Sequence, residues 1–179
     1  MITETPATAI ACRQIDEELA AAIGRGATQY LAIGNRCDLR ERRLPPEMRV
    51  LSLEKEFDNA GAEPVSSVLE EAGLSTDKIT FVSWLGGRIS VPQTIVSILR
   101  FIGSLPASSA LIFDYMIRRR HDDSRWETSM DALASEVGEP PCWHIDPQAL
   151  RTLLSASGFR QIKDLSPDDE YRRLMLAVV

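Results

Sequence analysis

This chain of 179 residues has few of the side chains that build metal or disulfide sites. It contains two histidines and three cysteines, and the cysteines stand far apart at Cys12, Cys37 and Cys142. Because there is no CxxC pair and no grouping of cysteine with histidine, the sequence predicts neither a disulfide framework nor a zinc site. We expect no metal, and a reducing cytoplasm is the simplest location for such a chain.

Long apolar runs are also missing from the sequence. No stretch approaches the roughly 18 consecutive apolar residues that a membrane span requires. Residues 1–10 lack the basic segment and apolar core of a signal peptide. We therefore expect a protein that is neither exported nor inserted into a membrane.

Basic charge is in the minority. Lys and Arg number 20 against 26 Asp and Glu, which gives a formal net charge of -6. An acidic balance disfavours a broad nucleic-acid interface, so nucleic acid is not an expected partner. The length and a hydrophobic share of 44% fit a single globular domain over residues 1–179.

What the chain does contain is an alternation of short apolar strands and amphipathic helices. The pattern predicts strands over residues 29–33, 49–53, 79–85, 110–116, 161–165 and 174–179. It predicts helices over residues 11–24, 65–72, 92–105 and 124–137, and a last helix that begins after the N-cap Asp146 and ends at Gly158. This α/β alternation favours a mostly parallel sheet, with the two final strands forming an antiparallel hairpin at one edge.

The most informative segment is residues 30–44, YLAIGNRCDLRERRL. A short apolar strand ends there at Gly34, which permits a tight turn, and Asp38 follows. The segment resembles the string VVILGAGLDTRAYRL of the leucine carboxyl methyltransferase-like family of enzymes that use S-adenosylmethionine (SAM), and the two align without a gap. Three further segments are similar to the same family in the same order, namely residues 11–19, 81–92 and 138–165.

The resemblance implies a three-layer, Rossmann-like class I methyltransferase fold. Its sheet would have the strand order 3-2-1-4-5-7-6, with SAM lying across the carboxyl ends of the strands. Of the family's SAM contacts, the matching positions here are Arg13, Gly34, Asp38 and Glu54. Glu54 fits an ordinary charge at a strand end equally well.

Other positions depart from the family's pattern. Arg36 stands at the family's second glycine, where a long cation would obstruct SAM and repel its sulfonium. The alternative is that Arg36 points to solvent from a relaxed turn. Ala11 stands in place of an arginine that would help Arg13 to hold the SAM carboxylate.

The largest departure is a deletion. Residues 55–64 stand where the family has a helix and its third strand, which lines the adenine pocket. Without that strand, residues 49–53 would form the edge of the sheet, and an open edge invites pairing with another chain. We therefore expect a homodimer or a heteromeric partner chain at this edge.

Asp114, Tyr115 and His144 are candidate catalytic residues if the cleft serves another reaction. Asp114 is expected to end its strand, and the segment with Cys142, Trp143 and His144 is expected to approach the same face. His144 could act as an acid or base near neutral pH, and a loop histidine without a role is the alternative.

Two functional hypotheses follow. The first is a degenerate methyltransferase-fold protein that does not bind SAM alone and acts as a partner subunit or as a non-methylating enzyme on a small molecule. The second is an active SAM-dependent O- or carboxyl methyltransferase of a small molecule, completed by a second chain.

Overall fold

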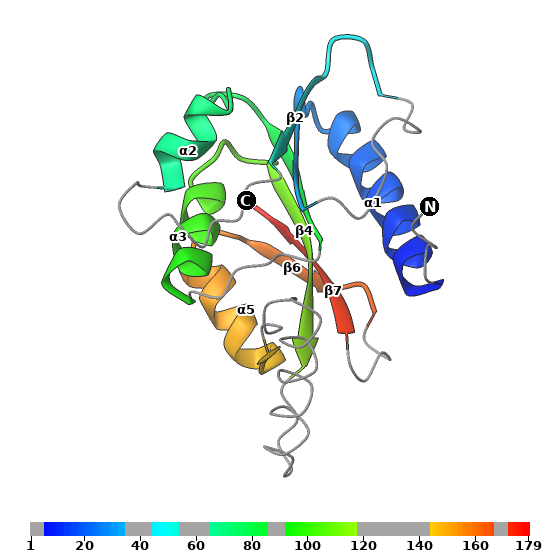
Figure 1. Ribbon diagram of the computed structural model, residues 1–179, viewed down its shortest axis with the longest axis vertical. Helices are drawn as coiled ribbons and strands as arrows, with labels where there is room; N and C mark the ends of the chain where they lie inside the picture. The colour runs from blue at the N-terminus through cyan, green and yellow to red at the C-terminus, as the bar shows by residue number, and fades with distance from the viewer. Residues whose placement is uncertain (1–5, 35–43, 54–64, 86–91, 118–143, 167–171) are drawn as a thin grey trace, which may run out of the picture.

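The computed structural model describes residues 6–34, 44–53, 65–85, 92–117, 144–166 and 172–179 (Figure 1). Its helices are α1 (Pro6–Gly24), α2 (Val65–Glu71), α3 (Pro92–Gly103) and α5 (Pro147–Ala156). Its strands are β1 (Gln29–Ile33), β2 (Arg49–Leu53), β3 (Thr80–Trp84), β4 (Ala110–Ile117), β5 (His144–Ile145), β6 (Gln161–Asp164) and β7 (Arg172–Val178).

The strands form one mixed sheet. Six of them lie in the order β2-β1-β3-β4-β7-β6, and the short β5 pairs with β4 off this path. The pairs β1 with β2, β1 with β3, β3 with β4 and β4 with β5 are parallel, whereas β7 runs antiparallel to both β4 and β6. The expected mostly parallel sheet with an antiparallel hairpin is therefore confirmed.

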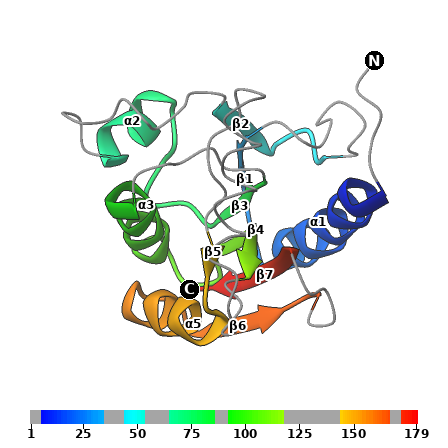
Figure 2. The ribbon, with the colours of Figure 1, turned by 60° about the horizontal axis from the view of Figure 1, so that its bottom comes forward.

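Helices cover both faces of the sheet (Figures 1 and 2). α1 packs on one face, and α2, α3 and α5 pack on the other. Along β1, Tyr30 and Ala32 belong to the core under α1, while Leu31 and Ile33 belong to the core under the other helices. Because successive side chains of a strand point to opposite faces, a strand buried on both sides favours consecutive apolar residues over alternation. This explains the unbroken apolar run before Gly34.

Most predicted elements are confirmed. β1 and β2 have the predicted bounds, and the other predicted strands differ only at their ends. Asp146 caps α5 as predicted, since its side chain accepts hydrogen bonds from the backbone N–H groups of Gln148 and Ala149. α1 begins earlier than predicted, at Pro6, and β5 was not predicted. The helix predicted over residues 124–137 lies outside the described residues.

β2 is the outer strand on its side of the sheet. Among the described residues no strand pairs with it except β1. Among the described strands the order matches the one that the class I resemblance implies, and none of them takes the place of that fold's third strand. No helix in the described ranges is long and apolar enough to cross a membrane.

Candidate functional site

The carboxyl ends of β1 and β3 form the point at which the chain changes direction across the sheet. From β1 the chain goes to β2 on one side, and then it returns to β3 on the other side. Such a switch point is where ligands bind in open α/β sheets. Gly34 follows β1 with φ at 74°, and its N–H donates to the carbonyl of Leu53 at 3.2 Å. A glycine suits this turn because residues with a Cβ rarely adopt positive φ.

Trp84 occupies the last position of β3, directly beside this turn. It pairs with Ile33 on β1 and with Phe113 on β4, and its side chain is only 6% exposed. Trp84 therefore packs in the core on the side of α2, α3 and α5. Its indole Nε1 is buried and has no hydrogen-bond partner in the described part of the chain. A buried donor without an acceptor is uncommon in proteins and is often explained by a water molecule or a ligand.

Asp114 and Tyr115 do not lie together. β4 continues to Ile117, so the expectation that Asp114 ends the strand is wrong. Asp114 pairs with Leu174, which belongs to the core under α1, whereas Tyr115 belongs to the core under α3 and α5. Because neighbouring residues of a strand face opposite ways, these two candidates cannot act on one bound molecule from a single face of the sheet.

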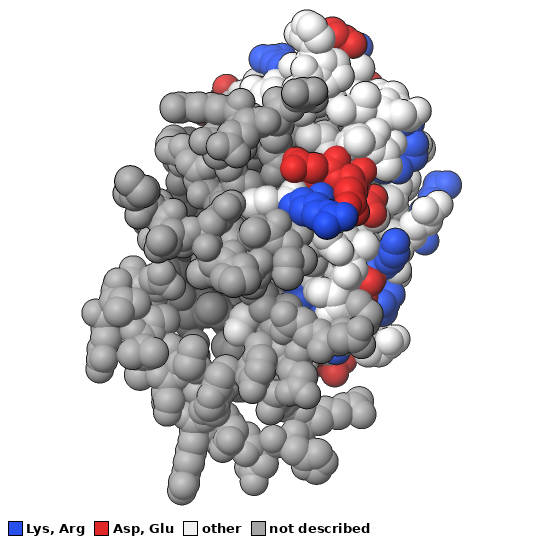
Figure 3. Space-filling model, turned by 90° about the vertical axis from the view of Figure 1, so that its right-hand side faces the viewer, with Lys and Arg blue, Asp and Glu red and all other residues white. Residues whose placement is uncertain are grey.

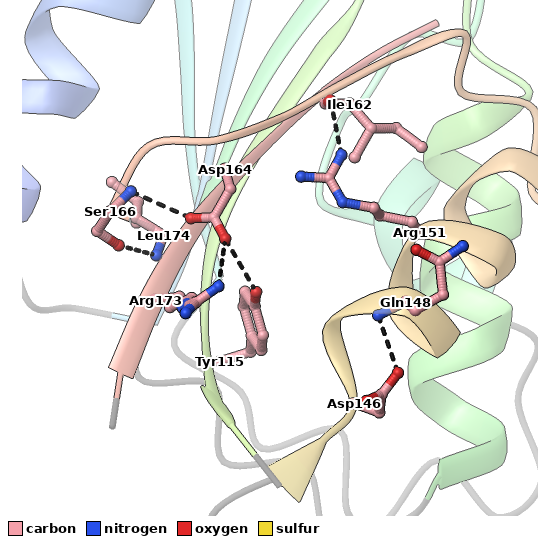
Figure 4. Close-up of polar contacts among 9 residues, drawn as sticks. All are labelled: Tyr115, Asp146, Gln148, Arg151, Ile162, Asp164, Ser166, Arg173 and Leu174. Carbon is pink, nitrogen blue, oxygen red and sulfur yellow. Dashed lines mark hydrogen bonds and ion pairs between the residues drawn. The ribbon is translucent and has the colours of Figure 1, made fainter. Parts of the chain in front are cut away.

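Tyr115 instead joins a polar cluster at the ends of β4, β6 and β7 (Figure 4). Its hydroxyl donates to Asp164 in a long contact of 3.5 Å, and Arg173 donates to the same carboxylate oxygen at 3.1 Å. The other oxygen of Asp164 accepts from the backbone N–H of Ser166 at 3.1 Å. Asp164 was not among the predicted site residues, although a carboxylate near the end of a predicted strand was a usable signal.

The environment of Tyr115 keeps its hydroxyl protonated. Burial raises the pKa of Tyr115 to about 12, and the negative charge of Asp164 adds to the shift, while Arg173 opposes it. At neutral pH the Tyr115 hydroxyl therefore keeps its proton and donates a hydrogen bond to Asp164. The cluster therefore holds the end of the β6–β7 hairpin against β4, and Tyr115 does not act as a general base at neutral pH.

Arg13 is exposed on α1. Acidic and basic side chains gather on the face of the molecule seen from the side of α1 (Figure 3). The guanidinium of Arg13 is paired with Glu17 at 3.1 Å, and the two side chains are 82% and 62% exposed. Its role as an anchor for the SAM carboxylate stays a prediction. Arg36, Asp38 and Glu54 lie outside the described residues.

His144 begins β5 and pairs with Met116 near the end of β4, but its side chain is outside the described part of the structure. Cys12 on α1 is disulfide-bonded, which contradicts the expectation that the chain has no disulfide. The other two cysteines, Cys37 and Cys142, lie outside the described residues. In the described ranges no cluster of three or more His, Cys, Asp or Glu side chains could hold a metal ion.

Solved structures with the same arrangement identify the fold. A protein from Thermobifida fusca that is described as a methyltransferase is 10% identical, with a TM-score of 0.59 over 99% of this chain and 83% of that one. A DUF574 family protein from Streptomyces avermitilis is 12% identical, with a TM-score of 0.58 over 94% and 82%. The chain has the class I methyltransferase fold.

A third similar structure contains a ligand. It is magnesium protoporphyrin IX methyltransferase from Synechocystis with bound SAH, the demethylated product of SAM, at 12% identity and a TM-score of 0.50 over 93% of this chain and 82% of that one. No protein-family model matches this sequence. No curated protein matches it either.

The described residues fit part of a SAM site. Gly34 provides the turn that lets a ligand approach the backbone. On the other side of the switch point, no described strand lies beyond β2, and Arg13 is turned to solvent. These residues do not complete a SAM site on their own, so we assign no methyl-transfer step to them.

Proposed function

We propose that this protein is a degenerate member of the leucine carboxyl methyltransferase-like group that does not hold SAM alone. In this proposal it acts with a partner chain bound at the open edge of β2, either as a non-catalytic subunit or as a non-methylating enzyme on a small molecule. The observation that carries the proposal is the position of β2 as the outer strand of the described sheet. In a complete class I sheet one more strand would lie there.

Two further observations support the proposal. The single retained arginine of the expected carboxylate anchor, Arg13, forms its ion pair with Glu17 on the solvent side of α1. Tyr115, a candidate for acid–base work, is engaged with Asp164 and keeps its proton. Both side chains serve local structure, which suits a fold whose original chemistry has been lost.

Calorimetric titration of the purified chain with SAM and with SAH tests this proposal. We expect no saturable binding in the low-micromolar range at protein concentrations at which the chain is monomeric. Circular dichroism of the same sample controls for folding. Stoichiometric low-micromolar binding to the monomer would overturn the proposal.

A second candidate is an active SAM-dependent O- or carboxyl methyltransferase of a small molecule, completed by a second chain. The left-handed turn at Gly34 favours it, because this turn remains suited to a ligand at the switch point. This candidate predicts that SAM binding appears when the protein concentration is raised until the chain associates. The first candidate predicts no binding in either state.

A further inference from the structure

The backbone of β2 bonds to β1 on one side, and on its other side no described strand pairs with it. The N–H of Arg49 donates to the carbonyl of Thr28 at 3.0 Å, and the carbonyl of Leu53 accepts from Gly34 at 3.2 Å. In a parallel ladder alternate residues of a strand bond to the same neighbour. Arg49, Leu51 and Leu53 therefore face β1, and the N–H and C=O groups of Val50 and Ser52 point away from it.

The exposure of the β2 side chains also indicates that this edge is accessible. Val50 is 40% exposed and is the exposed large hydrophobic residue of the described surface. Ser52 is exposed as well, whereas Leu53 at the end of the strand is buried. Residues 50–53 contain no charge and no proline, which are the usual means of protecting an edge strand from pairing.

We propose that a second copy of this chain pairs with β2 as an antiparallel strand, about a twofold axis that passes beside Leu51. Val50 then lies opposite the partner's Ser52, and Ser52 lies opposite the partner's Val50. This inference rests on the proposed function, because it names the partner chain that completes the edge. The added strand occupies the side of β2 on which a complete class I sheet continues.

Backbone geometry selects this register. In antiparallel pairing two opposite residues exchange both hydrogen bonds when the N–H and C=O groups of both point across. With the axis at Leu51, all the outward groups of Val50 and Ser52 are paired. An axis at Val50 would set Ser52 opposite the partner's Met48, whose N–H already donates to the carbonyl of Pro45 at 3.0 Å in its own chain.

Charge selects the direction of the partner strand. An antiparallel pair about Leu51 places Arg49 opposite the partner's Leu53, so the two Arg49 side chains lie at opposite ends of the ribbon. Parallel pairing in register would set them side by side, and like charges on neighbouring strands are unfavourable. Two copies of β2 therefore pair more favourably in the antiparallel direction than in the parallel one.

Ser52→Pro tests the pairing without disturbing β1. Its N–H faces the open edge, and proline is tolerated at an edge position whose N–H is not used within the sheet. We expect the native chain to sediment as a dimer at high concentration and Ser52→Pro to dissociate at least about tenfold more readily, since each dimer loses two hydrogen bonds. Ser52→Ala keeps the N–H group and is the matched control, with native association. Val50→Lys leaves the backbone intact and should also weaken the dimer.

A mixing experiment tests the register. Val50→Cys and Ser52→Cys chains, oxidised together, should give a cross-linked dimer on a non-reducing gel, and each variant alone should give far less. The native chain, treated identically, controls for its own cysteines. Equal cross-linking in the single-variant samples would overturn the register.

The outcomes separate this inference from the proposed function. A native chain that stays monomeric at high concentration overturns the inference, as does a dimer that Ser52→Pro leaves intact. Neither result concerns SAM. Tight SAM binding by the dilute monomer overturns the proposed function, even if the dimer forms through β2.

Discussion

Asp164 organises the carboxyl edge of the sheet on the side of β4, β6 and β7. Its carboxylate accepts from Tyr115, Arg173 and the backbone of Ser166 (Figure 4). The side chains of Asp164 and Arg173 are 8% and 23% exposed, so their ion pair is shielded from solvent better than a surface pair. Such a pair stabilises a structure chiefly because removal of one partner leaves the other charge poorly compensated.

Asp164→Asn should therefore lower the free energy of unfolding by about 2 kcal/mol, because Arg173 loses its counter-charge. Urea titration of the variant beside the native chain measures the difference. Lys163→Gln is a suitable control, since it also removes a charge from β6 but at an exposed position, and it should change stability by less than about 0.5 kcal/mol. Equal effects of the two substitutions would show that the cluster contributes little.

The proton of Tyr115 gives a second residue-scale prediction. The folded chain raises the pKa of Tyr115 to about 12, above its ordinary value of 10.0. The folded state thus holds this proton more tightly than the unfolded state does. Its contribution to stability is complete below pH of about 10 and is lost as the pH rises through about 12.

Tyr115→Phe removes that titration. Between pH of about 10 and about 12 the native chain should lose about 2 kcal/mol more stability than the variant. Urea titrations at several alkaline pH values measure how the free energy of unfolding changes with pH in each of the two proteins. Equal changes in the native chain and in Tyr115→Phe would mean that the folded chain does not retain the Tyr115 proton.

At the scale of elements, α3 and α5 approach each other closely at two glycines. A Cβ placed on Gly103 would overlap the carbonyl group of Ser157, and one placed on Gly158 would overlap the carbonyl oxygen of Gly103. Gly158 also follows the C-cap of α5 with φ at 109°, and the N–H of Phe159 donates to the carbonyl of Leu154. This is the Schellman arrangement that favours glycine after a helix.

Gly103→Ala should cost about 3 kcal/mol or more, because backbone atoms of α5 must move to admit the methyl group. Gly24→Ala is the matched control, since a Cβ there would meet no atom within 4 Å. The control should be neutral or slightly stabilising, as alanine favours a helix over glycine. Thermal unfolding of both variants checks the contrast, and a tolerated Gly103→Ala would contradict the close crossing.

At the scale of the whole molecule, the order of the strands predicts how stability is distributed. β1 and β3 have a neighbour on both sides and lie between two layers of helices, whereas β2 has only β1 as a described neighbour. Amides in the middle of such a sheet open only with global unfolding, and edge amides open locally.

Hydrogen exchange followed residue by residue should show this gradient. In dilute solution the amides of Leu31 and Val82 should exchange most slowly, and those of Val50 and Ser52 should exchange fast. Raising the protein concentration should slow Val50 and Ser52 alone, if a second copy covers their edge. Slow exchange of both residues in a monomer would show that some part of the same chain already covers the strand.

Sequence patterns predicted the elements well, but they predicted the candidate site only in part. The bounds of β1 and β2 and the cap at Asp146 follow from local signals, namely apolar runs and a capping residue. The separation of Asp114 from Tyr115 could also have been read from strand alternation, because the strand predicted over residues 110–116 already contains both residues. The contact of Tyr115 with Asp164 could not, because it joins residues 49 positions apart across β7.

The sequence by itself determined which segments are helices and strands, and which strands are buried on both faces, because side-chain periodicity is a local property of the chain. Only the tertiary structure decided that Trp84 lies beside the Gly34 turn with a buried donor that has no partner among the described residues, and that Gly103 meets Gly158. Those features depend on strand order, register and helix crossing. Each brings together residues that are distant in the chain, and no local pattern encodes such a meeting.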